Sequence, residues 1–403
     1  MTTLRVHPFT ALVPTREEQQ RIPTYGSGKR PQAELEQLAR EESHSYIRIV
    51  KPQFLDPDIE QGTDHFYQAS RAHLDVLLRA NSLVTMPNAM FLYEQQQPNI
   101  QPLRGVILAV GADNCGDGTV KKHENVIDSK AGRLVKHIDV LQSISEPVLL
   151  TQKLPNDIKS WLHAPRTSEP LVENTDVMGF VHRLWLLSED EQELILSGFQ
   201  ALNSLYIADG HHRVAAVTQY LQQSGKSTQH GLMSLVMDQD DLLIKSFHRL
   251  IKGVGKTDIL AYFDNHGISY SEVKDLTSIS LQANQVLVMN VQGAYQFALG
   301  TPEAGLNAVE QLEVSRIESG IMRDLLGIEN TSSDARISFM RGDTPLTQMQ
   351  EMIAKGDCDC VFVLPANSFA QVEAVADQNL TMPPKSTWVE PKLLTGLVSQ
   401  YFD

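Results

Sequence analysis

The chain has 403 residues, of which 34 are lysine or arginine and 49 are aspartate or glutamate, so its formal net charge is −15. Because nucleic-acid affinity depends largely on basic contacts to phosphates, this balance argues against general DNA or RNA binding. The apolar content of 42 % is that of a globular protein, and the length suggests about two or three domains. Apolar runs are too short to cross a membrane and the amino terminus lacks a signal-peptide core, so we expect a soluble cytoplasmic protein without a membrane partner.

The three cysteines, Cys115, Cys358 and Cys360, are too few for a disulfide framework. Zinc sites take about four ligands, and the Cys358–Cys360 pair has no second pair to complete such a set. We therefore expect these cysteines to be structural.

Strand and helix patterns alternate along the chain, which predicts an α/β or α+β fold. The predicted helices are 32–42, 64–80, 128–143, 188–200, 211–223, 256–265, 307–326, 345–355 and 368–379. The predicted strands are 104–110, 147–152, 177–187, 204–209, 232–238, 242–250, 285–292, 294–299, 337–341 and 359–364. Ser188 and Glu191 have the spacing of a capping box at the start of one predicted helix.

Gly253 and Gly255 follow a predicted strand and mark the expected domain boundary. We predict a core at 1–252 that includes an N-terminal extension, and an accessory α/β domain at 253–375. The last segment, 376–403, is rich in proline and is predicted to return to the functional site.

The densest chemistry lies in S-L-Y-I-A-D-G-H-H-R, residues 204–213. Strand-forming residues precede Gly210 and helical spacing follows it, so the glycine is predicted at a sharp strand-to-helix turn. Free amides at the helix start, together with Arg213, make an anion site in which the guanidinium binds a phosphate at two points. Asp209 is then the predicted ligand of Mg²⁺. In the structural alternative, Asp209 caps the helix and the two histidines are merely exposed.

A second segment, G-T-V-K-K-H-E-N at 118–125, leads into a predicted helix that carries Arg133. Glu124 acts as a general base if it is desolvated, and the neighbouring cations suit phosphate. The alternative is a solvated run of charges on a loop. Ile127 excludes the H-E-x-x-H zinc motif at this position.

A third segment, M-P-P-K-S-T at 382–387, is followed by Pro391 and Lys392. Proline fixes φ, so the loop loses little entropy on ordering, and its ammonium and hydroxyl groups suit phosphate or carboxylate. The alternative is a C-terminal arm that is docked by its prolines.

These motifs stand in the order found in the bacterial and archaeal family filed as domain of unknown function 1015, which the chain resembles over nearly its full length. The matching segments are VHPFTAL at 6–12, FLYEQ at 91–95, TVKKHEN at 119–125, YIADGHHR at 206–213 and MPPKSTWVEPKLLTGLV at 382–398. The chain departs from the usual pattern at 22–26, Gln53 and Val126, where members usually carry Pro-Pro-Tyr-Asp, glutamate and threonine.

The D-G-H-H-R turn also resembles that of free serine kinases built on the fold shared by ParB and sulfiredoxin. This resemblance implies a ParB/sulfiredoxin-like nucleotide-binding core within 1–252, with additional α/β elements. It further implies phosphoryl transfer from ATP or ADP to a small hydroxy amino acid, with a glutamate as base, for which Glu124 is the candidate.

Three functions follow from these observations: a kinase of free serine or a similar hydroxylated metabolite, a non-catalytic nucleotide-binding regulator, and a ParB-like DNA-binding partition protein. The net charge and the absence of a basic helix-turn-helix stretch argue against the third. The predicted catalytic residues are Glu124, Asp209, His211 and His212. Phosphate binding is predicted for Lys122, His123, Arg133, Gly210 and Arg213, and substrate or phosphate binding for Lys385, Ser386, Thr387 and Lys392.

Overall fold

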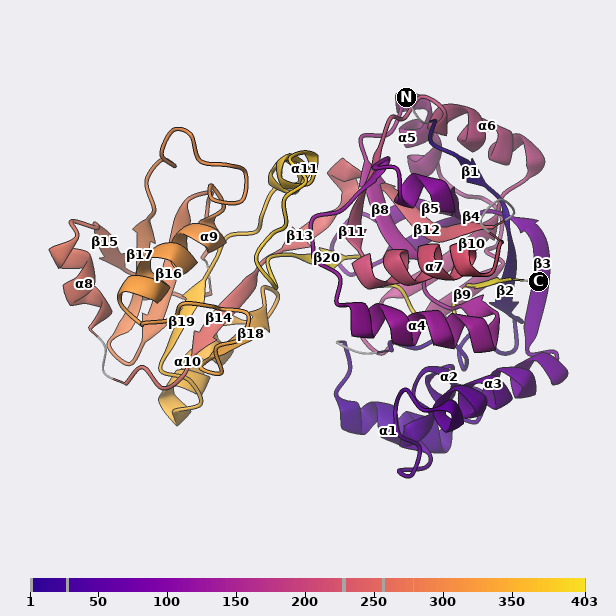
Figure 1. Ribbon diagram of the computed structural model, residues 1–403, viewed down its shortest axis with the longest axis horizontal. Helices are drawn as coiled ribbons and strands as arrows, with labels where there is room; N and C mark the ends of the chain where they lie inside the picture. Colours follow the sequence, from indigo (N-terminus) through magenta and orange to yellow (C-terminus); the bar gives the residue numbers. More distant parts are fainter. Residues whose placement is uncertain (1–2, 27–28, 227–229, 256–257, 278, 403) are drawn as a thin grey trace. The chain divides into compact units, whose positions relative to one another are not determined.

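The computed structural model describes residues 3–26, 29–226, 230–255, 258–277 and 279–402 (Figure 1). The chain folds into two compact units, each a mixture of helices and strands, which confirms the predicted α/β class. The first unit comprises Met1–Lys121, Asn125–Leu242 and Pro391–Asp403, and the second comprises Lys122–Glu124 and Leu243–Glu390. None of the helices in the described residues has the length and apolar character that crossing a bilayer requires.

A nine-stranded sheet forms the centre of the first unit, in the order β6-β11-β8-β12-β5-β4-β10-β9, with β1 paired to β5. Its strands are β1 (Val6–His7), β4 (Phe91–Gln96), β5 (Leu103–Gly111), β6 (Val120–Lys121), β8 (Val148–Gln152), β9 (Val172–Thr175), β10 (Val181–Leu186), β11 (Leu205–Asp209) and β12 (Gly231–Asp238). The β6–β11 and β8–β12 pairs are parallel and the others are antiparallel. Every residue of β12 is buried, because the strand is covered on both faces.

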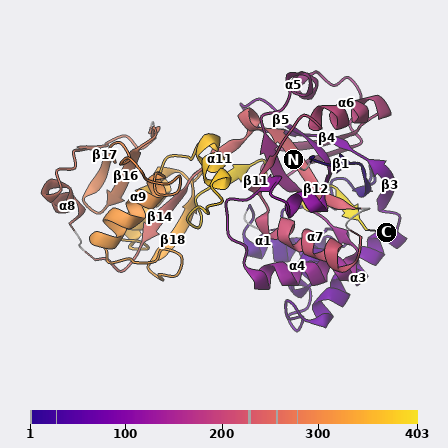
Figure 2. The same ribbon diagram turned by 45° about the horizontal axis from the view of Figure 1, so that its top comes forward.

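Helices cover this sheet in successive layers. They are α1 (Gln32–Glu41), α2 (Ile47–Val50), α3 (Asp64–Arg79), α4 (Asp128–Leu141), α5 (Asn156–His163), α6 (Glu189–Phe199) and α7 (His211–Gln223), with 3-10 turns η1 (Pro52–Phe54), η2 (Ala112–Cys115) and η3 (Gln239–Asp241). Helix α7 packs on β8 and β12, α4 packs on α7, and α3 packs on α4 (Figure 2). The predicted capping box of Ser188 and Glu191 is present at the start of α6.

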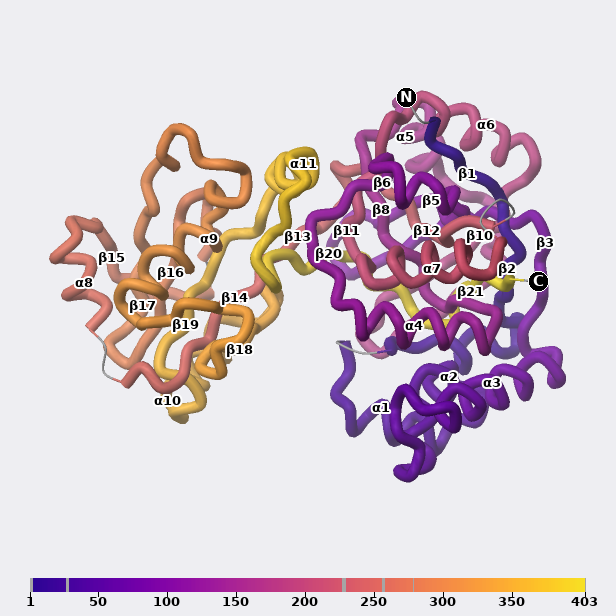
Figure 3. Tube along the Cα trace, viewed as in Figure 1, coloured from indigo at the N-terminus to yellow at the C-terminus, as the bar shows by residue number. Residues whose placement is uncertain are grey.

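A smaller sheet of the first unit contains strands from both ends of the chain, in the order β3-β2-β21-β7. Its strands are β2 (Phe9–Pro14), β3 (Leu83–Ala89), β7 (Ser143–Ile144) and β21 (Ser399–Tyr401). Ala11 is paired with Gln400, so strands from opposite ends of the chain lie side by side (Figure 3). A bridge between Thr24 and Thr395 adds a second connection, and the C-terminal segment is therefore held within the first unit.

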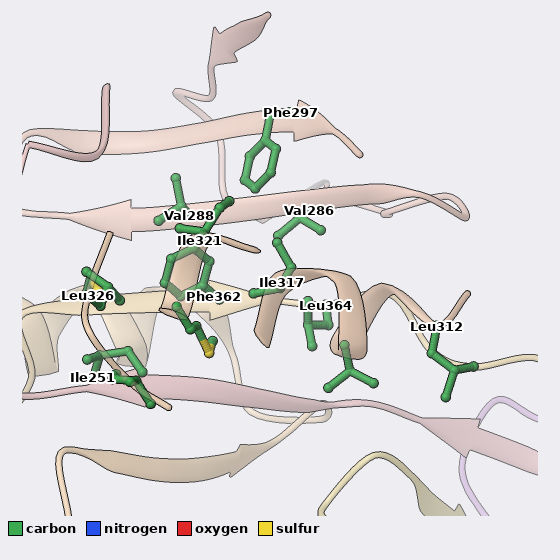
Figure 4. Close-up of a cluster of buried hydrophobic side chains, with 14 of the residues drawn as sticks. Ile251, Val286, Val288, Phe297, Leu312, Ile317, Ile321, Leu326, Phe362 and Leu364 are labelled. Carbon is green, nitrogen blue, oxygen red and sulfur yellow. The ribbon is translucent and has the colours of Figure 1, made fainter. Parts of the chain in front are cut away.

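The second unit is built on a six-stranded antiparallel sheet in the order β15-β17-β16-β19-β14-β18. These strands are β14 (Phe247–Ile251), β15 (Tyr270–Glu272), β16 (Gln285–Asn290), β17 (Gly293–Ala298), β18 (Ile337–Arg341) and β19 (Cys360–Val363), and a separate ribbon pairs β13 (Leu243–Lys245) with β20 (Trp388–Glu390). Its helices are α8 (Ile259–Asn265), α9 (Glu313–Ile317), α10 (Leu346–Lys355) and α11 (Phe369–Asp377). Val286, Phe297 and Phe362 from the sheet pack with Ile317 and Ile321 in the core of this unit (Figure 4).

Three predicted elements and the domain boundary differ from the structure. The predicted strand 177–187 begins only at Val181, as β10, because a turn precedes it. The predicted strand 242–250 is divided into β13 and β14, and the second unit begins at Leu243 rather than near Gly253, because β14 pairs with β18 and β19. The predicted helix 307–326 is confined to α9 and a π-helical turn, η4 (Glu318–Met322). Residues 256 and 257, at the start of the predicted helix 256–265, lie outside the described residues.

Candidate functional site

The strand-to-helix turn predicted at Gly210 is present. Strand β11 ends at Asp209, Gly210 adopts a left-handed conformation with φ 103° and ψ 28°, and α7 begins at His211. A Cβ on Gly210 would lie 3.0 Å from Nε of Arg213, so the turn needs glycine both for its φ and for the approach of the arginine. The N-cap residue of α7 is Gly210, and the Asp209 oxygens accept from Arg213 and Lys392, so the structural alternative in which Asp209 caps the helix is not observed among the described residues.

Asp209 belongs instead to a chain of ion pairs within the first unit. Lys392 Nζ lies 2.7 Å from Asp209 Oδ1, and Arg213 Nη2 lies 2.8 Å from Oδ2 of the same carboxylate. The other terminal nitrogen of Arg213 lies 3.0 Å from Glu146 Oε1 and donates to the Pro147 carbonyl at 2.6 Å. The 209–213 turn and Lys392 of the C-terminal segment are thus in direct contact.

The two carboxylates of this chain have opposite pKa shifts. Burial works against ionisation of Asp209, but the charges of Lys392 and Arg213 outweigh it and hold the pKa of Asp209 below its usual value. Burial is the main influence on Glu146 and raises its pKa, with Arg213 opposing the shift. About a third of each side chain remains exposed.

These contacts change two predicted roles. Each oxygen of Asp209 already binds a cationic nitrogen, and a divalent cation placed there would face Lys392 and Arg213 at short range. Asp209 therefore does not fit the predicted role of Mg²⁺ ligand. Arg213 is occupied by two carboxylates and a carbonyl, so a phosphate would have to displace one of them to be held at two points.

A cavity of about 360 Å³ lies beside this chain of ion pairs, within the first unit. We call it the cationic cavity, because Lys51, Lys130, Arg133 and Arg213 line it against the single carboxylate of Glu146. The predicted residues His212 and Arg213 line it from α7, and the predicted Arg133 lines it from α4. His212 accepts a hydrogen bond from the Ile127 backbone N–H at 3.4 Å, and burial lowers its pKa.

Lys51 is the most informative of the cations in this cavity. Its side chain is half-buried, and desolvation lowers its pKa. Within the described part of the chain its ammonium forms no ion pair. A desolvated cation without a counter-charge is unfavourable, and a bound anion would remove that penalty.

An aromatic wall closes another part of the cationic cavity. It is formed by Phe66, Tyr67 and His137, whose ring centroids lie 5.4 to 6.3 Å apart. Burial lowers the pKa of His137 to about 4, so the imidazole is neutral at pH 7. Its Nε2 is buried and, among the described residues, has no hydrogen-bond partner.

His211, at the start of α7, is buried in the first unit, and the other remaining predicted residues belong to the second unit. There the backbone N–H of Met382 donates to the His123 carbonyl at 2.8 Å, which brings the 122–124 and 382–387 motifs together. Lys385 has a positive φ of 55°, and its Nζ lies 5.2 Å from the centre of the Phe247 ring. The Ser386 hydroxyl donates to the Pro383 carbonyl at 2.6 Å.

Buried Arg249 holds this proline-rich loop through hydrogen bonds to its backbone carbonyls. Its guanidinium donates to the carbonyls of Pro384 and Lys385 and forms an ion pair with Glu318 at 3.3 Å. The motifs predicted from sequence thus meet in two groups: Asp209, Arg213 and Lys392 in the first unit, and Lys122, His123, Glu124, Lys385, Ser386 and Thr387 in the second.

The family assignment rests on a comparison with family models. The model described as "Protein of unknown function (DUF1015)" matches residues 6–315. The chain belongs to the DUF1015 family. No curated protein matches this DUF1015 chain.

Several solved structures are similar to the DUF1015 chain at low TM-score. A free serine kinase in complex with AMP is 15 % identical with a TM-score of 0.38, and the match covers 73 % of this chain and 92 % of that one. A conserved hypothetical protein from Pyrococcus furiosus is 14 % identical with a TM-score of 0.35, covering 72 % and 94 %. SbnI with a C-terminal truncation from Staphylococcus aureus is 15 % identical with a TM-score of 0.34, covering 70 % and 82 %.

Sequence reasoning about this DUF1015 chain missed Lys51, Lys130 and Glu146. Glu146 precedes β8, and the antiparallel pairing of β8 with β11 puts the start of one strand beside the end of the other, where Asp209 lies. The strand pattern at 147–152 was visible in the sequence, but its pairing partner was not. Lys51 carries no local signal, since the cavity gathers segments that are far apart in the chain.

Proposed function

We propose that this protein binds a nucleotide in the cationic cavity and transfers a phosphoryl group to a small hydroxylated metabolite, with free serine as the first candidate. The observation that carries the proposal is the unpaired, desolvated Lys51 in a cavity that Lys130 and Arg133 also line. In a chain of net charge −15, such a concentration of cations favours a polyanionic ligand. The D-G-H-H-R turn, which resembles that of free serine kinases, points to phosphoryl transfer.

The cavity has a cationic part and an aromatic part, and the two parts of a nucleotide match them. Its phosphates contact Lys51, Lys130 and Arg133, where charge-assisted hydrogen bonds are short and strong. Its base contacts the wall formed by Phe66 and Tyr67, since planar rings stack favourably on aromatic side chains. The volume of about 360 Å³ is of the size that small-molecule sites have.

Arg213 and Lys392 are proposed to stabilise charge that develops during transfer. Held by Asp209, the two cations are positioned in advance and need little reorganisation. Asp209 is then a positioning residue for these two cations and not a metal ligand.

In the transfer step, the bond between the transferred phosphorus and the nucleotide oxygen breaks and a bond to the acceptor hydroxyl oxygen forms. The hydroxyl proton passes to a carboxylate. We assign this function to Glu146, because it lines the cavity and burial raises its pKa, which makes it a better base than an ordinary glutamate. Glu124, the base predicted from sequence, is the competing assignment.

The test is incubation of the full chain with ATP or ADP and serine, with phosphoserine detected by ³¹P NMR and a panel of hydroxy acids run in parallel. We expect phosphoserine or another phosphomonoester, and we expect Glu146→Gln to lower kcat by about 10²-fold or more. If Glu124→Gln abolishes turnover while Glu146→Gln does not, the base is Glu124. If every acceptor is inert, the transferase proposal is wrong. Nucleotide binding without turnover identifies the protein as a regulator.

A further inference from the structure

Arg213 connects the cationic cavity to the chain of ion pairs in the first unit. Its guanidinium binds Asp209 at 2.8 Å, the Pro147 carbonyl at 2.6 Å and Glu146 at 3.0 Å. Of these three partners, only Glu146 lines the cationic cavity together with Arg213. An anion that enters the cavity therefore reaches the guanidinium on the side where Glu146 is bound.

The three partners of Arg213 differ in how readily an anion can replace them. Asp209 is held a second time, by Lys392 at 2.7 Å. The Pro147 carbonyl belongs to the backbone directly before β8 and has no rotamer through which to move away. Glu146 has a flexible side chain, a third of which is exposed, and in the described part of the chain Arg213 forms its only ion pair. Glu146 is therefore the partner that a phosphate replaces at the lowest cost.

An anion in place of Glu146 changes the electrostatics of its carboxyl group in two ways. Glu146 loses the charge of Arg213, which opposes the effect of burial on its pKa, and it gains a negative charge nearby. Both changes favour the protonated carboxyl, so the pKa of Glu146 is higher in the liganded protein than in the empty one. Asp209 and Lys392, the other charged groups close to Glu146, remain paired with each other.

The cationic cavity holds other groups that respond to a bound anion. Lys51, Lys130 and Arg133 are cations, and an anion strengthens their charged state. Burial lowers the pKa of both His137 and His212, so an anion favours proton binding by these imidazoles as well. A measurement on Glu146 must therefore be separated from the two histidines.

We propose that a phosphate bound in the cationic cavity takes Arg213 from Glu146, and that the released Glu146 carboxyl binds a proton from solvent. The inference rests on the proposed nucleotide site and adds its regulation. In the empty site the ion pair with Arg213 keeps Glu146 engaged, and the nucleotide itself frees this carboxyl for the acceptor hydroxyl. Nucleotide therefore binds before the acceptor, and the fraction of Glu146 that remains ionised is a stronger base than in the empty site.

The test is calorimetry of the full chain with ADP between pH 6 and pH 8, in pairs of buffers that differ in ionisation enthalpy, which counts the protons bound per nucleotide. ADP and the two histidines contribute equally in wild type and in Glu146→Gln, so the difference between these proteins belongs to Glu146. We expect wild type to take up about half a proton more than the variant where the difference is greatest, and its affinity to gain up to about tenfold more for each pH unit lowered.

The affinity at pH 8 separates this function of Glu146 from a structural one. There Glu146→Gln is expected to bind ADP at least as tightly as wild type, because it lacks the carboxylate that competes for Arg213, whereas a structural Glu146 predicts weaker binding. Glu193→Gln, exposed on α6, is the matched control and is expected to take up as many protons as wild type.

Sulfate, whose charge is constant over this pH range, is the second probe. It is expected to raise the thermal unfolding midpoint of wild type more at pH 6 than at pH 8, and to show a smaller difference in Glu146→Gln. If sulfate behaves in this way but ADP does not bind, the nucleotide proposal is wrong and the exchange at Arg213 stands. If ADP binds and both proteins take up the same number of protons, the exchange is wrong and the nucleotide site stands. Absence of binding of both ADP and sulfate contradicts both.

Discussion

At the scale of single residues, Gly210 decides whether the chain of ion pairs can form. Its φ of 103° is strained for any other residue, and a Cβ would press on the guanidinium of Arg213. We expect Gly210→Ala to lower the free energy of unfolding by about 1–3 kcal/mol, measured by urea denaturation. Gly132→Ala is the control: it lies within α4, and nothing surrounds the position of its Cβ, so this variant is expected to gain about 0.5–1 kcal/mol. Equal effects of the two substitutions would contradict the account of the turn.

His137 is expected to make stability depend on pH. Burial lowers its folded pKa to about 4 from 6.5, so below pH 6.5 the unfolded chain takes up a proton that the folded chain does not. The contribution of neutral His137 to the free energy of unfolding is therefore fully present above pH 6.5 and is lost progressively as the pH falls towards 4. In His137→Gln the urea midpoint is expected to fall less steeply over this range, and identical pH profiles of the two proteins would show that the imidazole is not buried.

Sequence reasoning identified the residues of the turn because their chemistry is concentrated in consecutive positions. It assigned Asp209 to a metal, however, because nothing in the local sequence shows that Lys392 binds the same carboxylate. It also passed over Lys51, whose importance comes only from its desolvation and its lack of a counter-charge.

At the scale of elements, the C-terminal strand β21 connects the two sheets of the first unit through Gln400. This side chain is fully buried: its oxygen accepts from the Met233 backbone and its nitrogen donates to the Gly231 carbonyl, both at 3.0 Å. Gln400→Leu leaves both backbone groups of β12 without partners, so we expect a loss of about 2–4 kcal/mol in the free energy of unfolding. Ser399→Ala, in the same strand, is the control and is expected to cost clearly less. A small effect of Gln400→Leu would mean that β21 does not stabilise the sheet.

The element pattern was largely predictable because helix and strand periodicities are local. Helices 211–223 and 128–143 and strands 204–209 and 337–341 were found at or within two residues of their ends. Strands β2, β3 and β4 were not predicted, and β3 is hard to predict because Pro87 lies within it and its side chains are mostly exposed. The pairing of β2 with β21 joins opposite ends of the chain, which no local pattern reveals.

At the scale of the whole molecule, the charge distribution argues against the ParB-like alternative. A net charge of −15 disfavours a phosphodiester backbone spread over a broad surface, whereas the cationic cavity offers its positive groups to one compact anion. The ParB-like alternative requires the opposite distribution, and a salt-dependent mobility shift of duplex DNA at physiological ionic strength would be evidence for it.

The central claim is that the cationic cavity seats the phosphates of a nucleotide, and isothermal calorimetry of the full chain with ADP and ATP tests it most directly. We predict that wild type binds one nucleotide per chain, that Lys51→Met and Arg133→Met each weaken binding by about tenfold, and that Arg79→Met, at the exposed end of α3, leaves it unchanged. Absence of binding to the wild type, or equal affinities in all four proteins, would contradict the claim.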